Sequence, residues 1–249
     1  MYLIDWNFFD MIWCIHYANY KNRVEPLKSE LYRVGITASG KLSWHYTFDT
    51  VFNNIFFDVT KKINSNHAKN TNVLSCTLAH YHCIKASYSL GCNNVLIMED
   101  DIRFLNDTNE IRKAIDMIPP DGDIVLFDTL PANKDKYRKY VTDMKYNDFF
   151  AEYVDDINSC GCYMLGRRGM RAMIEVYEHS VEASDFYTNM LTMEHGIRKY
   201  FAINPITCQC QYSDSNNIKI YGNSSFELPY KISGIDFSNY NMGDANEKG

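Results

Sequence analysis

The sequence lacks several features that would place it in a familiar class of protein. Its eight cysteines include no Cys-x-x-Cys pair, so neither a dense disulfide framework nor zinc knuckles are indicated. It has no dense block of Lys and Arg, and its formal net charge is −6, which disfavours nucleic-acid binding. No Gly-rich phosphate loop is visible, which argues against a nucleotidyltransferase or a similar metal-dependent nucleotide enzyme.

Long apolar runs are also missing. No segment approaches the roughly 20 consecutive apolar residues that a membrane-spanning helix needs. The apolar and aromatic stretch 1–17 is interrupted by Asp5 and Asp10, and it has neither a basic start nor a small-residue cleavage site. We therefore expect a cytoplasmic protein with no transmembrane segment, or one whose contact with a membrane is peripheral.

The hydrophobic pattern predicts strands that alternate with helices. Met11–Tyr17 is typical of a buried strand, and 22–31 has the apolar spacing of a helix that stops before Gly35. A longer helix is expected at 73–90, with Gly91 ending it. The other predicted elements are a helix at 109–117, strands at 123–127 and 160–165, and helices at 169–177 and 185–195. We expect one α/β domain with a mainly parallel central sheet at 11–221, and a polar C-terminal tail at 222–249.

The most informative segment ends an apolar run in three acids. Val95–Met98 has the pattern of a strand buried on both faces, and Glu99, Asp100 and Asp101 follow it directly. In open α/β sheets, ligands bind outside the carboxyl ends of the strands. Hard cations such as Mg²⁺ and Mn²⁺ bind there through one or two carboxylates and substrate phosphates. This pattern predicts a nucleotide-diphosphate site, and a solvated acidic turn is the alternative.

The three acids are assigned different tasks. Asp101 is the first choice as metal ligand, and Glu99 is expected to bind either the metal through water or the ribose hydroxyls. Alternate residues of an extended segment point the same way, so Glu99 and Asp101 should share a face that Asp100 does not. Asp100 is grouped with the donor-binding residues.

Two neighbouring motifs resemble the signature of glycosyltransferase family 25, which includes lipopolysaccharide-modifying and collagen galactosyltransferases. The first motif is Leu74–His80, and the second is Val95–Phe104. Further similar pieces follow the family's order: the opening strand with Arg23, then 161–169, then 205–213 with Gln209 and Gln211. The sequence departs from the family at Ala79, at Phe127-Asp128, and in an Asp-Gly element that is not recognisable near 37–41.

The resemblance implies a GT-A type, Rossmann-like fold and a metal-dependent inverting transfer of a hexose, of the galactose or glucose type. The donor would be a nucleotide diphosphate sugar, commonly a UDP-hexose, and the cofactor Mn²⁺ or Mg²⁺. The acceptor would be a hydroxyl of a glycan, a lipid-linked glycan or a glycoprotein. Inversion requires a base that deprotonates this hydroxyl. Asp185 lies near the family's aspartate and is the candidate, with a helix cap as the alternative.

Several other residues have two readings. His80 would hydrogen-bond the nucleotide or position a carboxylate, or it is a satisfied core histidine. Arg23 would hold the donor's phosphates, since a guanidinium can bind two oxygens at once, or it is a surface arginine. Cys76, His80 and Cys83 form one helical stripe that could present three zinc ligands, and further ligands could come from Cys160, Cys162, Cys208 and Cys210. Structural zinc is nevertheless not expected, because Cys-x-x-Cys pairs are absent and cysteines are usually buried. Asp128, at a strand end, is either a metal or acceptor contact or a turn acid.

A hypothesis from another class also fits this sequence. A catalytically silent relative could bind a nucleotide sugar or glycan and act as a scaffold module. The intact Glu99-Asp100-Asp101 argues against it, whereas the missing Asp-Gly element leaves room for it.

Overall fold

A computed structural model describes most of the chain, in segments separated by gaps. The described residues are 4–47, 71–105, 107–128, 130–131, 134–155, 157–158, 160–179, 187–188, 191, 196–212 and 218–220. Two expectations fall outside them. These are the polar tail at 222–249 and the helix at 185–195, of which only residues 187, 188 and 191 are described.

The centre of the fold is a seven-stranded sheet in the order β2-β1-β3-β9-β5-β10-β7. Its strands are β1 (Met11–Tyr17), β2 (Leu42–Thr47), β3 (Asn94–Glu99), β5 (Ile124–Leu126), β7 (Phe150–Glu152), β9 (Cys162–Gly166) and β10 (Lys199–Ala202). The pairings leave five strands pointing one way, with β9 and β7 opposed to them. The expected α/β class with a mainly parallel central sheet is confirmed.

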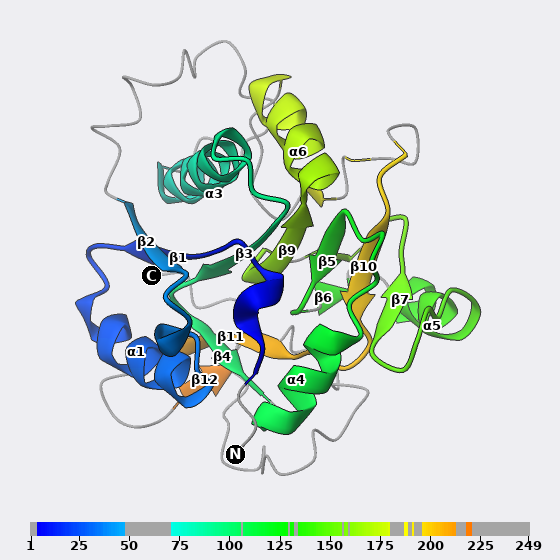
Figure 1. The fold of residues 1–249 in the computed structure, drawn as a ribbon, viewed down its shortest axis with the longest axis horizontal. Helices are drawn as coiled ribbons and strands as arrows, with labels where there is room; N and C mark the ends of the chain where they lie inside the picture. The colour runs from blue at the N-terminus through cyan, green and yellow to red at the C-terminus, as the bar shows by residue number, and fades with distance from the viewer. Residues whose placement is uncertain are drawn as a thin grey trace.

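Helices cover both faces of this sheet, as Figure 1 shows. They are α1 (Val24–Arg33), α3 (Thr71–Ser89), α4 (Thr108–Asp116), α5 (Lys134–Asp143) and α6 (Arg167–His179), with short 3-10 turns η1 (Trp6–Phe8), η2 (Lys21–Arg23) and η3 (Thr37–Ser39). The core residues of α3 and α6 belong to one hydrophobic cluster, and those of α1 and α4 belong to another on the opposite face. The architecture is therefore a helix–sheet–helix sandwich.

Strand β3 lies between the two hydrophobic clusters, which explains its unbroken apolar sequence. Val95 and Ile97 pack into the cluster that contains α3, whereas Leu96 and Met98 pack into the cluster that contains α1. All four side chains are at most 1% exposed. Successive side chains of a strand point to opposite faces, so a strand covered on both faces is apolar throughout.

Smaller strands extend the region beyond the end of β3. A three-stranded sheet runs in the order β12 (Ile218–Ile220), β11 (Thr207–Tyr212) and β4 (Ile102–Phe104), and β6 (Leu130–Pro131) pairs with β8 (Ile157–Asn158). The pairing of β4 with β11 is antiparallel and sets Gln209 opposite Ile102. Residues from late in the chain are thereby brought beside the three acids.

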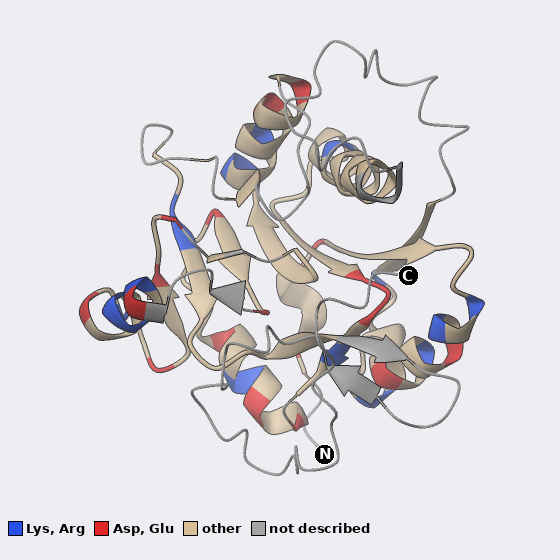
Figure 2. Cartoon of the chain, turned by 180° about the vertical axis from the view of Figure 1, so that it is seen from behind, with Lys and Arg blue, Asp and Glu red and all other residues tan. Residues whose placement is uncertain are grey.

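Charged residues on the helices are of mixed sign, as Figure 2 shows for α1, α4, α5 and α6. Many form pairs one helical turn apart, such as Lys28 with Glu25 and Lys113 with Glu110. Charges of both signs are therefore interspersed on these helices. In the described part of the chain, no helix is both long enough and apolar enough to cross a membrane.

Candidate active site

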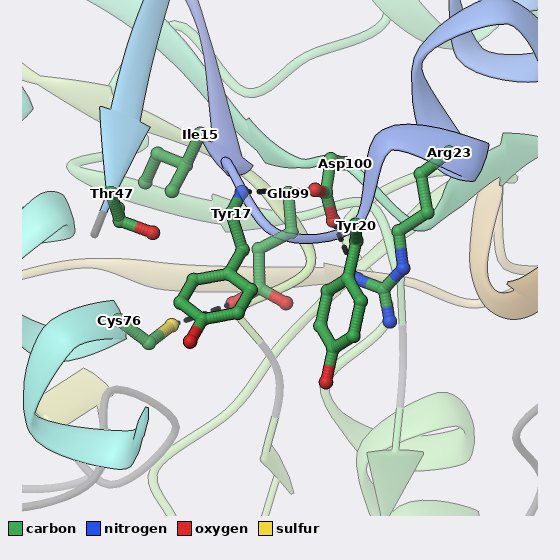
Figure 3. A pocket seen from close by; sticks show the side chains of 8 residues that line it. All are labelled: Ile15, Tyr17, Tyr20, Arg23, Thr47, Cys76, Glu99 and Asp100. Atoms are coloured by element: carbon green, nitrogen blue, oxygen red, sulfur yellow. Dashed lines mark hydrogen bonds and ion pairs between the residues drawn. The ribbon is translucent and has the colours of Figure 1, made fainter. Parts of the chain in front are cut away.

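The carboxyl ends of β1 and β3 meet beside η2 and the first half of α3, and a pocket opens there. This position follows from the parallel pairing of β1 with β3, which brings Ile15 opposite Glu99. The pocket, shown in Figure 3, is lined by residues of all these elements: Ile15, Tyr17, Tyr20, Arg23, Thr47, Cys76, Glu99 and Asp100. The site therefore lies where the strand-end rule predicts it.

Asp100 is buried, and both of its carboxylate oxygens have hydrogen-bond partners. One carboxylate oxygen accepts a hydrogen bond from Arg23 at 2.6 Å, and the other accepts one from the backbone N–H of Tyr17 at 3.0 Å. His16 Nδ1 lies 2.6 Å from that second oxygen. Because these contacts use both oxygens, Asp100 ties β1 and η2 to the end of β3.

Asp101 has a much poorer environment. Its Oδ2 lies 3.4 Å from the Arg23 guanidinium, whereas its Oδ1 is buried and has no hydrogen-bond partner among the described residues. Burial, with charge repulsion by Glu99 and to a lesser extent Asp100, raises the pKa of Asp101 to about 8, although Arg23 opposes this shift. Asp101 is therefore a buried carboxyl that is protonated more readily than an exposed one and that forms an ion pair through Oδ2 only.

Glu99 faces a different group of partners. Its Oε1 lies 3.1 Å from His80 Nε2, 3.3 Å from Cys76 Sγ and 3.5 Å from Cys160 Sγ. Gln209 donates a hydrogen bond to Oε2 at 2.7 Å. Burial by itself raises the pKa of Glu99, but the contacts with His80 and the two thiols outweigh it, so the pKa is lowered.

The expected division of the acids by strand alternation does not describe these contacts. Strand β3 ends at Glu99, and Asp100 and Asp101 form a turn. Asp100 and Asp101 therefore share Arg23, while Glu99 has its own partners. Alternation holds only as long as the backbone stays extended, and the sequence did not reveal where it stops.

His80 combines both of its predicted readings. It is fully buried, and its Nδ1 lies 2.8 Å from the hydroxyl of Tyr163 in the core. Its Nε2 contacts Glu99, so the ring positions a carboxylate at the pocket. Cys76, His80 and Glu99 bring their ligand atoms within 4.8 Å of one another.

Two tyrosines of the pocket were not among the predicted site residues. The rings of Tyr17 and Tyr20 have centroids 5.0 Å apart, and the Arg23 guanidinium lies 4.2 Å from the centroid of Tyr20. Figure 3 shows the Tyr20 ring standing between Arg23 and the rest of the pocket. Tyr17 is the last residue of a predicted strand, so the strand-end rule that selected the acids could also have selected it.

The remaining candidates lie elsewhere or outside the described residues. Asp185, the predicted base, is among the residues that the structure does not describe. Asp128 is buried, and one of its oxygens accepts a hydrogen bond from the backbone N–H of Cys162 at 3.2 Å. Arg167 stacks on Tyr88 and donates a hydrogen bond to Cys92, which gives it a structural role at the start of α6.

Comparison with models of protein families identifies the family of this chain. The model of glycosyltransferase family 25, described as an LPS biosynthesis protein family, matches residues 43–188. That match includes α3, the three acids and β9. The chain belongs to glycosyltransferase family 25, so its class is that of the glycosyltransferases. A comparison with curated proteins finds no match.

Solved structures resemble the chain only distantly. A197 from STIV aligns with a TM-score of 0.41 at 11% identity, covering 84% of this chain and 90% of that one. A glycosyltransferase involved in glycosylation of the major capsid of PBCV-1 gives 0.35 at 12% identity, covering 68% and 66%. Mouse xyloside xylosyltransferase 1 gives 0.33 at 10% identity, covering 75% and 82%.

Proposed function

We propose that the chain is a metal-dependent inverting glycosyltransferase. It would move a hexose of the galactose or glucose type from a nucleotide diphosphate sugar, such as a UDP-hexose, to a glycan acceptor hydroxyl. The observation that carries the proposal is Asp101, whose buried Oδ1 has no hydrogen-bond partner among the described residues at the carboxyl end of β3. Most buried polar atoms are hydrogen-bonded, and a carboxylate oxygen without such a partner beside two further acids at a pocket suits a cation.

The charge balance of the pocket supports a cation. Glu99 and Asp100 line the pocket, and Asp101 follows them in the turn behind its wall. Arg23 is the one Lys or Arg side chain among the described residues that forms an ion pair with any of these three acids. Oxygen ligands beside a phosphate site suit Mn²⁺ or Mg²⁺. Asp101 would hold the ion directly, and Asp100 would keep Arg23 in place. The bound ion would offset the negative charge that develops on the departing diphosphate.

The other pocket residues fit the remaining parts of such a donor. The neighbouring rings of Tyr17 and Tyr20 offer apolar faces for a nucleobase or ribose. The Arg23 guanidinium has donors beyond those that it directs to Asp100, and a guanidinium binds phosphate oxygens in pairs. Both oxygens of Glu99 already have partners within the protein, so we propose that Glu99 shapes the pocket wall.

The transfer would proceed by one in-line displacement. The acceptor oxygen forms a bond to the anomeric carbon as the bond from that carbon to the diphosphate oxygen breaks, and the bonding pair leaves with the nucleotide diphosphate. The acceptor proton passes to a carboxylate, for which we retain Asp185. Attack opposite the leaving group inverts the configuration at the sugar carbon.

A donor screen tests the proposal. Common nucleotide sugars are incubated with and without Mn²⁺, and release of the nucleotide diphosphate is measured for wild type, Asp101→Asn and Asp143→Asn. Asp143 is an exposed acid on α5, at the far edge of the sheet, and serves as the matched control. Turnover of one donor by wild type and Asp143→Asn, only with metal and not by Asp101→Asn, would support the assignment. A wild type that turns over no donor would favour the silent binding module.

A further inference from the structure

A second cluster of metal-binding side chains lies beside the proposed donor site. It consists of Cys76 and His80 of α3, Glu99 of β3 and Cys160 before β9. We propose that these four side chains bind one Zn²⁺ ion, which fastens the helix to the end of the central strand. This inference goes beyond the proposed function, because it concerns a different ion and a different set of ligands.

The distances suit a tetrahedral ion. Cys76 Sγ lies 3.3 Å and His80 Nε2 lies 3.1 Å from Glu99 Oε1, and Cys160 Sγ lies 3.5 Å from the same oxygen. Zinc binds sulfur, nitrogen and oxygen at about 2.0–2.3 Å, so neighbouring ligands of a tetrahedral site lie about 3.3–3.8 Å apart. The three contacts of Glu99 Oε1 lie close to this range, and the other separations among Cys76, His80 and Glu99, which are at most 4.8 Å, would shorten around the ion.

Neighbouring side chains hold two of the four proposed ligands, His80 and Glu99, in a fixed orientation. His80 Nδ1 is occupied by the hydroxyl of Tyr163 at 2.8 Å, which leaves Nε2 facing Glu99. Gln209 fixes the other oxygen of Glu99 at 2.7 Å. In metal sites the second nitrogen of a ligating histidine and the second oxygen of a ligating carboxylate are usually held in this way.

The ligand chemistry selects the kind of ion. Two thiols and an imidazole favour zinc over Mn²⁺ and Mg²⁺, which prefer oxygen. Asp101 belongs to the other kind of site, since its buried Oδ1 and the neighbouring acids offer only oxygen. Two ions of different character would thus lie on either side of the turn that follows β3.

Because Cys-x-x-Cys spacings are absent, the sequence did not predict a structural zinc site. Helical spacing placed Cys83 on the same stripe as Cys76 and His80. In the structure Cys83 is packed in the apolar cluster under α3, while Glu99 and Cys160 approach from other segments. Only two of the four ligands lie on one helix, so a spacing rule could not have found the site.

Cobalt substitution tests the proposal. The full chain is stripped of metal under reducing conditions, Co²⁺ is added, and the absorption of tetrahedral Co²⁺ with thiolate ligands is recorded beside the zinc content of freshly purified protein. We expect wild type to hold one equivalent of zinc and to show this absorption. Cys76→Ser and His80→Gln should lose it, and Cys160→Ser should weaken or shift it. Cys83→Ser and His82→Gln, on the same helix, should retain it.

Two results would overturn the zinc site. One is a folded wild type that shows neither zinc nor thiolate–cobalt absorption, and the other is an equal loss of absorption in Cys83→Ser and Cys76→Ser. Far-UV circular dichroism of each variant separates loss of metal from loss of fold. Asp101→Asn should keep the cobalt spectrum, so failure of the zinc site and failure of the donor site can be told apart.

Discussion

Glu99 and Asp101 are two residues apart, yet they occupy opposite kinds of environment. Glu99 contacts an imidazole, two thiols and an amide, and its pKa is lowered. Asp101 forms an ion pair with Arg23 at 3.4 Å and has one buried oxygen with no hydrogen-bond partner among the described residues. Its pKa is raised to about 8 by burial first and by its acidic neighbours second. An acidic run is therefore not one functional unit. The turn after β3 separates Glu99, whose two oxygens both have partners, from Asp101, which has one oxygen without a hydrogen-bond partner among the described residues.

Asp101→Asn should have the largest effect on function. Removing a direct metal ligand is expected to lower Mn²⁺-dependent nucleotide affinity by more than about 100-fold, since losing only an orienting residue costs about 10–100-fold. The ligand-free protein should be no less stable than wild type, because a carboxyl with a pKa of about 8 is largely uncharged at neutral pH and the amide replaces it at nearly the same volume. Thermal unfolding with and without Mn²⁺ and UDP measures both. A strong ligand-induced shift retained in the variant would show that the metal is held elsewhere.

Asp185→Asn should abolish transfer while leaving donor binding intact, because the proposed base touches the acceptor and not the nucleotide. Product formation and UDP affinity are measured on the same preparation. Transfer at a near wild-type rate would place the base on another residue.

Glu99→Gln should lower the stability of the ligand-free protein, whereas Asp101→Asn should not. The change removes the charge that His80 and the two thiols surround, so we expect about 1–3 kcal/mol of destabilisation. Urea unfolding of both single variants checks the comparison. Equal stability changes in the two would mean that their environments do not differ as described.

Gly161→Ala tests the environment of Glu99 by displacing Gln209, which donates a hydrogen bond to Glu99. A Cβ at Gly161 would lie 2.4 Å from Asp128 Oδ2 and 2.7 Å from Gln209 Cγ, so Gln209 would have to move away. We expect about 1–3 kcal/mol of destabilisation from overpacking. Gly40→Ala is a control for substitution of a glycine, since its Cβ would meet nothing within 4 Å, although Gly40 has a positive φ of 69° that adds strain of its own. If Gly161→Ala cost no more stability than Gly40→Ala, the close packing around Gln209 would be refuted.

Tyr20→Ala should have the smallest effect. The ring lies beside Tyr17 at an interplanar angle of 56° and under the Arg23 guanidinium, and cation–π contacts contribute about 0.5–1 kcal/mol at exposed sites. UDP affinity should therefore fall by a few-fold, with Tyr32→Ala, an exposed tyrosine on α1, as the control. An unchanged affinity would remove Tyr20 from the donor site.

Much of the fold could be predicted from the sequence because its strongest signals are local. Strand β1 has the predicted bounds Met11–Tyr17, and α3 ends immediately before Leu90 and the predicted stop at Gly91, whose positive φ of 82° suits glycine. The strand predicted at 160–165 is β9, but its antiparallel direction between β3 and β5 could not be inferred from its apolar pattern. Direction depends on the path of the intervening chain, which periodicity does not describe.

The candidate site could be predicted only in part. The strand-end rule pointed to the acids and the family resemblance pointed to Arg23, and Glu99, Asp100 and Arg23 line the pocket. The contacts of Glu99 with Gln209 and Cys160 join residues 110 and 61 positions apart, and they depend on the pairing of β4 with β11 and of β3 with β9. A rule based on spacing cannot detect such a set.

The most direct test of the account is a calorimetric titration of UDP into wild type and Asp101→Asn, each with and without Mn²⁺. We expect wild type to bind UDP tightly only with Mn²⁺, and the variant to show the same weak binding with or without the metal. Unchanged affinity of Asp101→Asn for UDP in the presence of Mn²⁺ would contradict the assignment of Asp101 as the metal ligand.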